Sequence, residues 1–169
     1  MSSISIRGEA PAEVEAVRRV NDAAFGRPDE GRLVDALRGA ARPFVSLVAR
    51  DDDEVVGHVL FTPVTVGATW TALALGPMAV VPGRQRAGFG AALVRAGLDA
   101  CRALGHDVVF VLGHPAYYPR FGFAPAAPRG LRCKWPVPDD VFLVAELAPG
   151  ALAGRTGLVE YHPAFDAAT

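Results

Sequence analysis

The stretch Val80-Val-Pro-Gly-Arg-Gln-Arg-Ala-Gly-Phe-Gly-Ala-Ala-Leu93 joins an apolar run to a helical pattern through a glycine-rich turn. The unpaired N–H groups at a helix start and the positive end of the helix dipole converge on one point, so such a turn is typical of anion-binding sites. Gly88 and Gly90 allow a diphosphate to approach the backbone closely. Arg84 and Arg86 add positive charge for further phosphates. The segment therefore predicts a site for a phosphate-bearing ligand.

The elements that flank this turn predict a parallel strand pair. Residues Ala87 to Leu104 are predicted to form a helix, which Gly105 ends. Its apolar residues hold a 3.6-residue period: Phe89, Ala92, Leu93, Ala96, Ala100 and Leu104. The uninterrupted apolar run Val108–Leu112 is typical of a strand covered on both faces. A strand, a helix and a second strand in this order favour a parallel pair with a right-handed crossover.

The strand before the turn, Trp70 to Val81, contains Gly76-Pro77 in its middle. A proline there removes a ladder hydrogen bond unless the strand is bulged or lies at an edge. The sequence therefore predicts a bulge at this point.

The rest of the chain predicts further strands and two more helices in the same domain. Alternating polarity and turn residues indicate strands at Ile4 to Ile6, Phe44 to Arg50, Val55 to Val66, Val141 to Leu147 and Leu158 to Tyr161, and helices at Pro11 to Phe25 and Glu30 to Arg38. Asp51 to Asp53 are turn formers, so the second and third of these strands form a hairpin. We expect one mixed α/β domain over residues 1–169, with a mostly antiparallel twisted sheet.

The composition limits the classes of function. Of 169 residues, 51% are hydrophobic and 21% charged, and the formal net charge is −1, which indicates a globular protein and gives no support for nucleic-acid or membrane binding. Cys101 and Cys133 stand apart, with no disulfide or metal-ligand spacing. No stretch is apolar enough to cross a membrane, and the N-terminus lacks a targeting pattern. We expect a cytoplasmic protein without a metal.

Three families of phosphate-binding loop are compared with the turn. A nucleoside-triphosphatase loop places lysine where this chain has Phe89. A dinucleotide fingerprint requires glycine or alanine where this chain has Leu93, which disfavours a nicotinamide-dependent oxidoreductase. The remaining pattern, Gln85-x-x-Gly88-x-Gly90, resembles the [QR]xxGx[GA] motif of the GNAT superfamily of N-acetyltransferases, and the later segment His114 to Phe123 resembles its YhbS-like subgroup.

The resemblance implies that the turn grips the pyrophosphate of acetyl-CoA. It also implies that the bulged strand splays from its parallel neighbour and pairs with the pantetheine arm. The implied cofactor-binding residues are Met78, Ala79, Val80, Gln85, Arg86, Ala87, Gly88, Phe89, Gly90 and Ala91. A backbone N–H near Val80 is expected to polarise the thioester carbonyl.

The resemblance also implies a catalytic residue, because Tyr118 is in register with a Tyr-x-x-x-Gly-Phe element of the family. Its phenol is expected to protonate the departing thiolate as a general acid. A buried aromatic residue is the alternative, and the adjacent Tyr117 could take either role. His58, His114 or a water relay could accept the proton of the amine. The asparagine common just after the preceding strand is absent, and Gly113 and His114 lie there instead.

The sequence therefore predicts an acetyl-CoA-dependent N-acetyltransferase in which a primary amine of a small molecule or peptide attacks the thioester directly. The alternative is a non-catalytic acyl-CoA-binding module of the same fold. The identity of the amine, the use of longer acyl groups and a possible homodimer stay open.

Overall fold

A twisted sheet organises the computed structural model, which describes residues 4–168. Residues 1–3, part of the N-terminus in which no targeting pattern is expected, and Thr169 lie outside the described residues. The strands of the described part are β1 (Ile4–Gly8), β2 (Val45–Asp51), β3 (Glu54–Val66), β4 (Trp70–Val80), β5 (Val108–Leu112), β6 (Ala124–Pro125), β7 (Leu131–Cys133), β8 (Phe142–Glu146) and β9 (Gly157–Glu160). Their main order is β1-β2-β3-β4-β5-β8-β6, while β9 pairs with β3 and β7.

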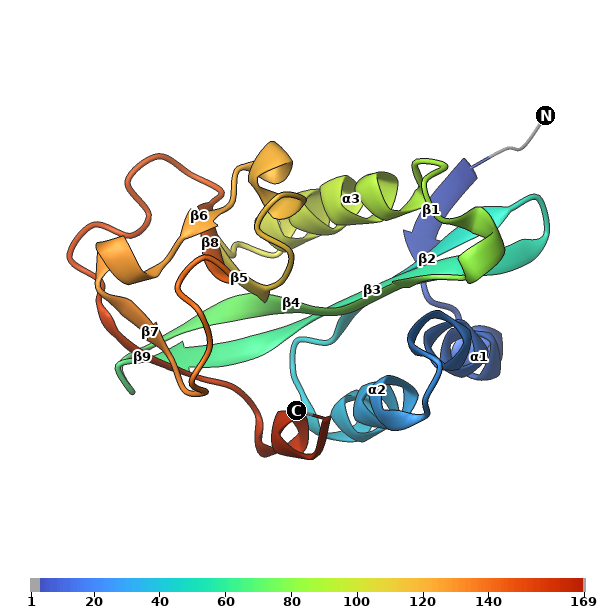
Figure 1. The fold of residues 1–169 in the computed structure, drawn as a ribbon, viewed down its shortest axis with the longest axis horizontal. Helices are drawn as coiled ribbons and strands as arrows, with labels where there is room; N and C mark the ends of the chain where they lie inside the picture. The colour runs from blue at the N-terminus through green and yellow to red at the C-terminus, as the bar shows by residue number, and fades with distance from the viewer. Residues whose placement is uncertain (1–3, 169) are drawn as a thin grey trace.

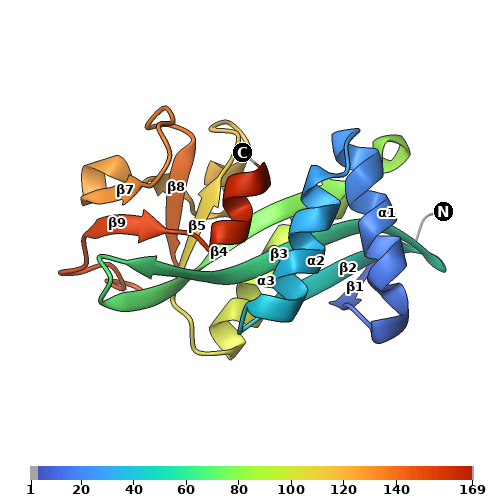
Figure 2. The ribbon, with the colours of Figure 1, turned by 90° about the horizontal axis from the view of Figure 1, so that it is seen from below.

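Helices cover both faces of the sheet. Figure 1 shows α1 (Val14–Phe25) and α2 (Asp29–Ala40) on one face and α3 (Phe89–Ala103) on the other. Seen from the side of α1 and α2, the C-terminal 3-10 turn Pro163–Ala168 lies next to α2 (Figure 2). Further 3-10 turns are Pro11–Glu13, Pro82–Arg84, Tyr118–Phe121 and Ala127–Arg129. Within the described residues, no helix is both long and apolar enough to span a bilayer.

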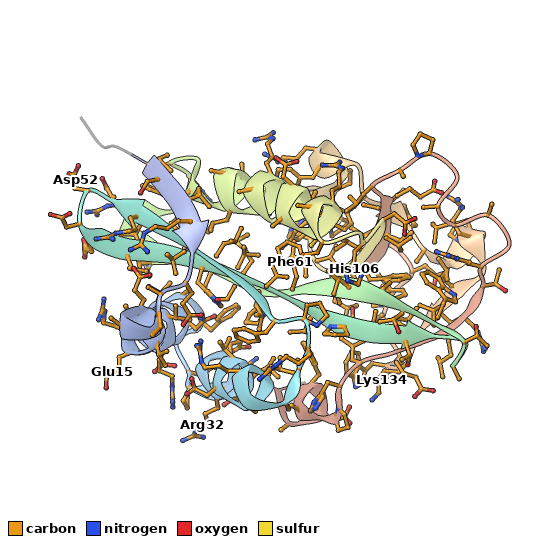
Figure 3. All side chains as sticks on the ribbon, turned by 180° about the vertical axis from the view of Figure 1, so that it is seen from behind. Glu15, Arg32, Asp52, Phe61, His106 and Lys134 are labelled. Atoms are coloured by element: carbon orange, nitrogen blue, oxygen red, sulfur yellow. The ribbon has the colours of Figure 1, made fainter. Side chains whose placement is uncertain are left out.

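The pairing pattern confirms the predicted mixed sheet. The β2–β3 hairpin turns at Asp52, at the far tip of the sheet in Figure 3. Neighbouring strands are antiparallel except for the parallel pairs β4–β5 and β7–β9. Both of the late strands that the sequence predicts join this sheet, β8 beside β5 and β9 beside β3. The short strands β6 and β7 interrupt the proline-rich segment and were not predicted.

The apolar face of α3 differs from the predicted stripe. Phe89 and Leu93 are buried as expected, but the helix also buries Val94, Gly97, Leu98 and Cys101. Leu104, the predicted end of the stripe, is 56% exposed. Gly97 lies against Phe61 of β3, and a Cβ atom at Gly97 would come within 2.2 Å of that ring. Figure 3 shows Phe61 between the sheet and α3, so the contact with this ring rotates the buried face away from the alanines.

The predicted bulge in β4 is confirmed, and it separates β4 from β5. The register between β3 and β4 shifts in the Val59 to Phe61 segment, opposite Gly76 and Pro77. Pairing between β4 and β5 covers only Leu73 to Leu75 of β4. The end of β4 therefore keeps its partner on the β3 side, while its other edge has no β5 partner. Backbone groups on a strand edge without a neighbour are free to pair with a ligand.

Candidate functional site

The turn after β4 has the backbone geometry of an anion site. Arg86 (φ 63°) and Gly88 (φ 91°) both have left-handed conformations on either side of Ala87. A left-handed arginine is disfavoured by about 1 to 2 kcal/mol, and such turns direct successive N–H groups into one concave surface. The helix α3 begins at Phe89, not at the predicted Ala87, which lies in the turn.

The first N–H groups of α3 face no capping side chain. Gly88 occupies the N-cap position without a side-chain hydrogen bond, and the first bond of the helix runs from the Ala92 N–H to the Gly88 carbonyl at 3.1 Å. The N–H groups of Phe89, Gly90 and Ala91 precede that bond, so the helix itself provides them with no acceptor. Donors and the helix dipole together favour a bound anion at this end.

Two side chains hold the turn in place. The Gln85 side-chain amide donates a hydrogen bond to the Val80 carbonyl at 3.0 Å, which closes the turn onto the end of β4. The Arg84 Nε donates to Asp51 Oδ2 at 2.9 Å, which ties the turn to the β2–β3 hairpin. The charge of Arg84, which was expected to face phosphates, is therefore paired with Asp51.

A cleft of about 720 Å³ opens in front of this turn. We call it the larger cleft; its walls are formed by Ala24, Phe25, Met78, Ala79, Val80, Arg84, Gln85, Arg86, Gly88, Gly90, Ala91, Gly113, His114, Tyr117, Tyr118 and Arg120. Among these described residues there are three arginines and no carboxylate, and since Arg84 pairs with Asp51, Arg86 and Arg120 provide the positive charge for a ligand. The cleft is thus suited to a polyanion, and its floor is the free edge of β4.

The larger cleft contains eight of the ten residues predicted to bind the cofactor. Ala87 and Phe89 are the two that do not line it. Ala87 is exposed, and the Phe89 side chain is buried in the core below α3 with 2% exposure, so Phe89 can offer only its backbone N–H.

A second, smaller cavity of about 250 Å³ lies on the other side of the bulge. We call it the smaller cavity; its walls are formed by Phe25, Glu30, Leu33, Leu75, Gly76, Pro77, Met78, Leu112, Tyr118, Trp135, Tyr161 and Phe165. The two cavities share Phe25, Met78 and Tyr118 in their walls. A ligand in each could therefore meet at these three side chains.

The structure separates the two adjacent tyrosines. Tyr118 is 8% exposed, lines both cavities and packs edge-on against Phe123 with ring centroids 5.7 Å apart. Gly113 admits this ring, because a Cβ atom at Gly113 would lie 2.2 Å from it. Burial, with a smaller contribution from Tyr117, raises the pKa of Tyr118 above its ordinary value.

Tyr117 points toward the anion-binding turn. Its hydroxyl would lie 2.9 Å from a Cβ atom at Gly90, and the Arg120 guanidinium lies 4.6 Å from the centre of its ring. Burial raises the pKa of Tyr117, although Arg120 and Arg95 oppose the shift. Tyr117 lines only the larger of the two cavities, whereas Tyr118 lies at their junction.

The two histidines nearest the site in sequence have different surroundings. His58 is fully buried between Asn21 (3.1 Å) and Ser46 (2.8 Å), and burial together with Arg38 lowers the pKa of His58 to about 3. It lines neither cavity. His114 lines the larger cleft, and its Nδ1 accepts a hydrogen bond from the Ala116 N–H at 3.3 Å.

Sequence reasoning missed Arg120 and almost the whole smaller cavity. Arg120 occupies one of the unassigned positions in Tyr-x-x-x-Gly-Phe, and only its contact with Tyr117 shows its direction. The aromatic walls of the smaller cavity come from Phe25, Trp135, Tyr161 and Phe165, which are far apart in sequence. No spacing pattern links such residues, so no sequence signal was available.

The comparisons with known proteins agree with this geometry. The family model described as "Acetyltransferase (GNAT) domain" matches residues 5–126. The chain is 40% identical to the uncharacterized N-acetyltransferase YhbS of Escherichia coli over 163 residues. This match covers 95% of this chain and 98% of YhbS. The crystal structure of E. coli YhbS in complex with CoA matches with a TM-score of 0.92 and 38% identity, over 98% of this chain and 93% of that one. A GNAT family acetyltransferase of Brucella melitensis in complex with acetyl-CoA matches with a TM-score of 0.81 and 36% identity, over 97% and 99% of the two chains.

Proposed function

The chain belongs to the GNAT family of acetyltransferases, and on this premise we propose that it transfers an acetyl group from acetyl-CoA to a primary amine of a small molecule or peptide. The observation that supports this most directly is the position of Tyr118 in the walls of both cavities. A phenol at the junction of a polyanion cleft and an apolar cavity can act on a bond between the two ligands.

The larger cleft fits the diphosphate of acetyl-CoA. The left-handed turn at Arg86 and Gly88 and the uncapped start of α3 supply backbone donors, and Gly90 leaves the space that a Cβ atom would fill. In this proposal Arg86 and Arg120 provide charge at its rim. Acetyl-CoA supplies the acetyl group as a reactive thioester.

We place the pantetheine arm along the end of β4. Residues Met78, Ala79 and Val80 line the larger cleft and belong to the stretch of β4 that has no β5 partner. The backbone groups of this stretch that face away from β3 are suited to the amides of the arm, apart from the Val80 carbonyl, which accepts from Gln85. A backbone N–H of this stretch then polarises the thioester carbonyl, where negative charge develops during transfer.

In the proposed reaction the amine nitrogen attacks the thioester carbonyl carbon directly. The new C–N bond forms, the C–S bond breaks, and Tyr118 donates its proton to the leaving sulfur. The Tyr118 phenol is protonated at neutral pH, as a general acid requires, because the ordinary pKa of tyrosine is about 10 and burial raises the pKa of Tyr118. The amine proton leaves to solvent through the larger cleft, where His114 is the one histidine among the described wall residues.

The competing proposal is a non-catalytic acyl-CoA-binding module. Such a module needs the larger cleft but needs neither an acid at its end nor a second cavity beyond that acid. The smaller cavity and Tyr118 therefore favour an enzyme.

Two measurements test the proposed function. Isothermal titration calorimetry should show binding of acetyl-CoA and CoA, with NAD as the control that does not bind. A thiol-release assay over a broad amine panel should then show CoA production that depends on both amine and protein. Binding without thiol release from any amine would support the binding module, and absence of binding would contradict both proposals.

A further inference from the structure

The walls of the smaller cavity are mostly aromatic and aliphatic. Trp135 packs on Tyr161 with ring centroids 4.9 Å apart, and Tyr161 packs on Phe165 at 5.1 Å. Phe25, 40% exposed, lies in the walls of both cavities. Trp135, Tyr161 and Phe165 thus pack on one another and form an aromatic wall, against which a planar group packs well.

The one carboxylate in the described walls of the smaller cavity, Glu30, is paired with Arg27. No lysine, arginine or histidine accompanies Glu30 among these described wall residues. Arg27 donates to both oxygens of Glu30, from Nε to Oε1 at 3.0 Å and from Nη2 to Oε2 at 2.5 Å. Glu30 is 8% exposed, and the two hydrogen bonds from Arg27 neutralise the charge of this wall carboxylate.

These contacts restrict the substrate. A second ammonium group on the acceptor would be buried without a free anion, and a carboxylate would be buried without a cation. Burial of an unpaired charge in apolar surroundings is strongly disfavoured. The volume of about 250 Å³ lies just below the usual range for ligand pockets, which is roughly 300 to 1,000 Å³. The acceptor that fits is small, with one amine and no other charged group.

We propose that the acceptor is a primary monoamine on a single apolar body, of the size and shape of 2-phenylethylamine, whose ring lies among Trp135, Tyr161 and Phe165 and whose nitrogen points past Tyr118. This inference rests on the proposed function. The reaction converts the amine and acetyl-CoA into the N-acetyl amide and CoA: the amine proton is released to solvent, the Tyr118 proton passes to sulfur, and Tyr118 regains a proton from solvent. The apolar walls also favour the neutral amine over its ammonium form, which is the form that attacks.

A matched substrate panel tests the inference. 2-Phenylethylamine and L-phenylalanine share the ring and the amine and differ by a carboxylate, while spermidine carries several ammonium groups and no ring. At saturating acetyl-CoA, kcat/KM for 2-phenylethylamine should exceed that for either of the others by at least about 100-fold, because each of the others must bury an unpaired charge. Comparable or faster turnover of L-phenylalanine or spermidine would overturn the inference and leave the proposed function intact.

A variant of the aromatic wall and a product-binding measurement test the same inference without relying on the substrate panel alone. Trp135→Leu should lower kcat/KM for 2-phenylethylamine roughly tenfold by loss of ring contacts, with unchanged affinity for acetyl-CoA. Leu104→Ala, at an exposed position at the end of α3, is the control. N-acetyl-2-phenylethylamine should bind the wild-type protein with CoA present, measured by calorimetry. Absence of this binding, or equal turnover by Trp135→Leu, contradicts the inference; acetyl-CoA binding without turnover of any amine contradicts the proposed reaction as well.

Discussion

The larger cleft and the smaller cavity lie on the two sides of one bulge in β4 but have opposite chemistry and different origins in the chain. The larger cleft takes most of its walls from two short segments, the end of β4 with the following turn and residues Gly113 to Arg120. The smaller cavity draws on α1, α2, β4, β5 and the C-terminal third. The cleft proposed for acetyl-CoA is thus built mostly from local sequence, whereas the cavity proposed for the acceptor is built by distant segments.

The largest effect should come from the side chain at the junction. Tyr118→Phe removes the proposed proton donor and keeps the ring against Gly113, so kcat should fall by roughly 100-fold or more with little change in acetyl-CoA affinity. Steady-state kinetics and calorimetry measure the two quantities. Tyr117→Phe is the matched control, because Tyr117 lines only the larger of the two cavities, and its kcat should change by only a few-fold. If the two variants lose kcat equally, Tyr118 is not the acid.

The second-largest effect is a pH dependence of the folding stability, which we expect from His58, a residue outside both cavities. The pKa of His58 is lowered from 6.5 to about 3, so between these values the unfolded chain binds a proton that the folded chain does not. Stability is therefore fully present above pH 6.5 and falls as the pH drops, with a loss on the order of 2 kcal/mol between pH 7 and pH 5. Urea unfolding of wild type and His58→Gln at both pH values measures this.

The His58→Gln variant is expected to be less stable overall but to lose most of that pH dependence. An equally steep decline in the variant would assign the acid sensitivity to other groups. The measurement also helps the comparison of the cavities. It shows how much of any loss of activity at low pH comes from unfolding of the protein, and how much is left to groups that line the larger cleft.

A substitution in the turn should affect only the larger cleft. Gly88 has φ 91°, so Gly88→Val strains the backbone and places a side chain where the anion is expected to bind. We expect the dissociation constant of acetyl-CoA to rise by about tenfold or more. Gly39→Ala in α2 is the control, since nothing lies within 4 Å of the added Cβ atom there. Unchanged acetyl-CoA affinity in Gly88→Val would place the diphosphate elsewhere.

The smallest effect should come from the exposed charge of the turn. Arg86→Ala should weaken acetyl-CoA binding by only a few-fold, because an exposed charge is largely screened by solvent and salt. The difference from wild type should shrink further at high salt, which calorimetry at two salt concentrations can measure. A large, salt-independent loss would indicate that Arg86 acts through its left-handed backbone instead.

Local patterns in the sequence predicted the elements around the larger cleft well. Pro77 predicted the bulge, and the turn at Gly88 predicted the start of a helix. The helix began two residues later than expected, because the left-handed Gly88 is its N-cap and leaves Ala87 in the turn. The stripe on α3 was partly wrong, since the position of Phe61 on another strand determines that Gly97 faces the core and Leu104 does not.

The sequence by itself determined the strand, turn and helix of the proposed anion site, because these depend on backbone conformations that glycine and proline control within a few residues. It also placed Tyr118 next to this site through a short motif. Only the tertiary structure decided which tyrosine lies between the cavities and which residues line the smaller cavity. Those choices depend on how Gly113, Trp135, Tyr161 and Phe165 pack, and packing between distant segments leaves no periodic pattern in the chain.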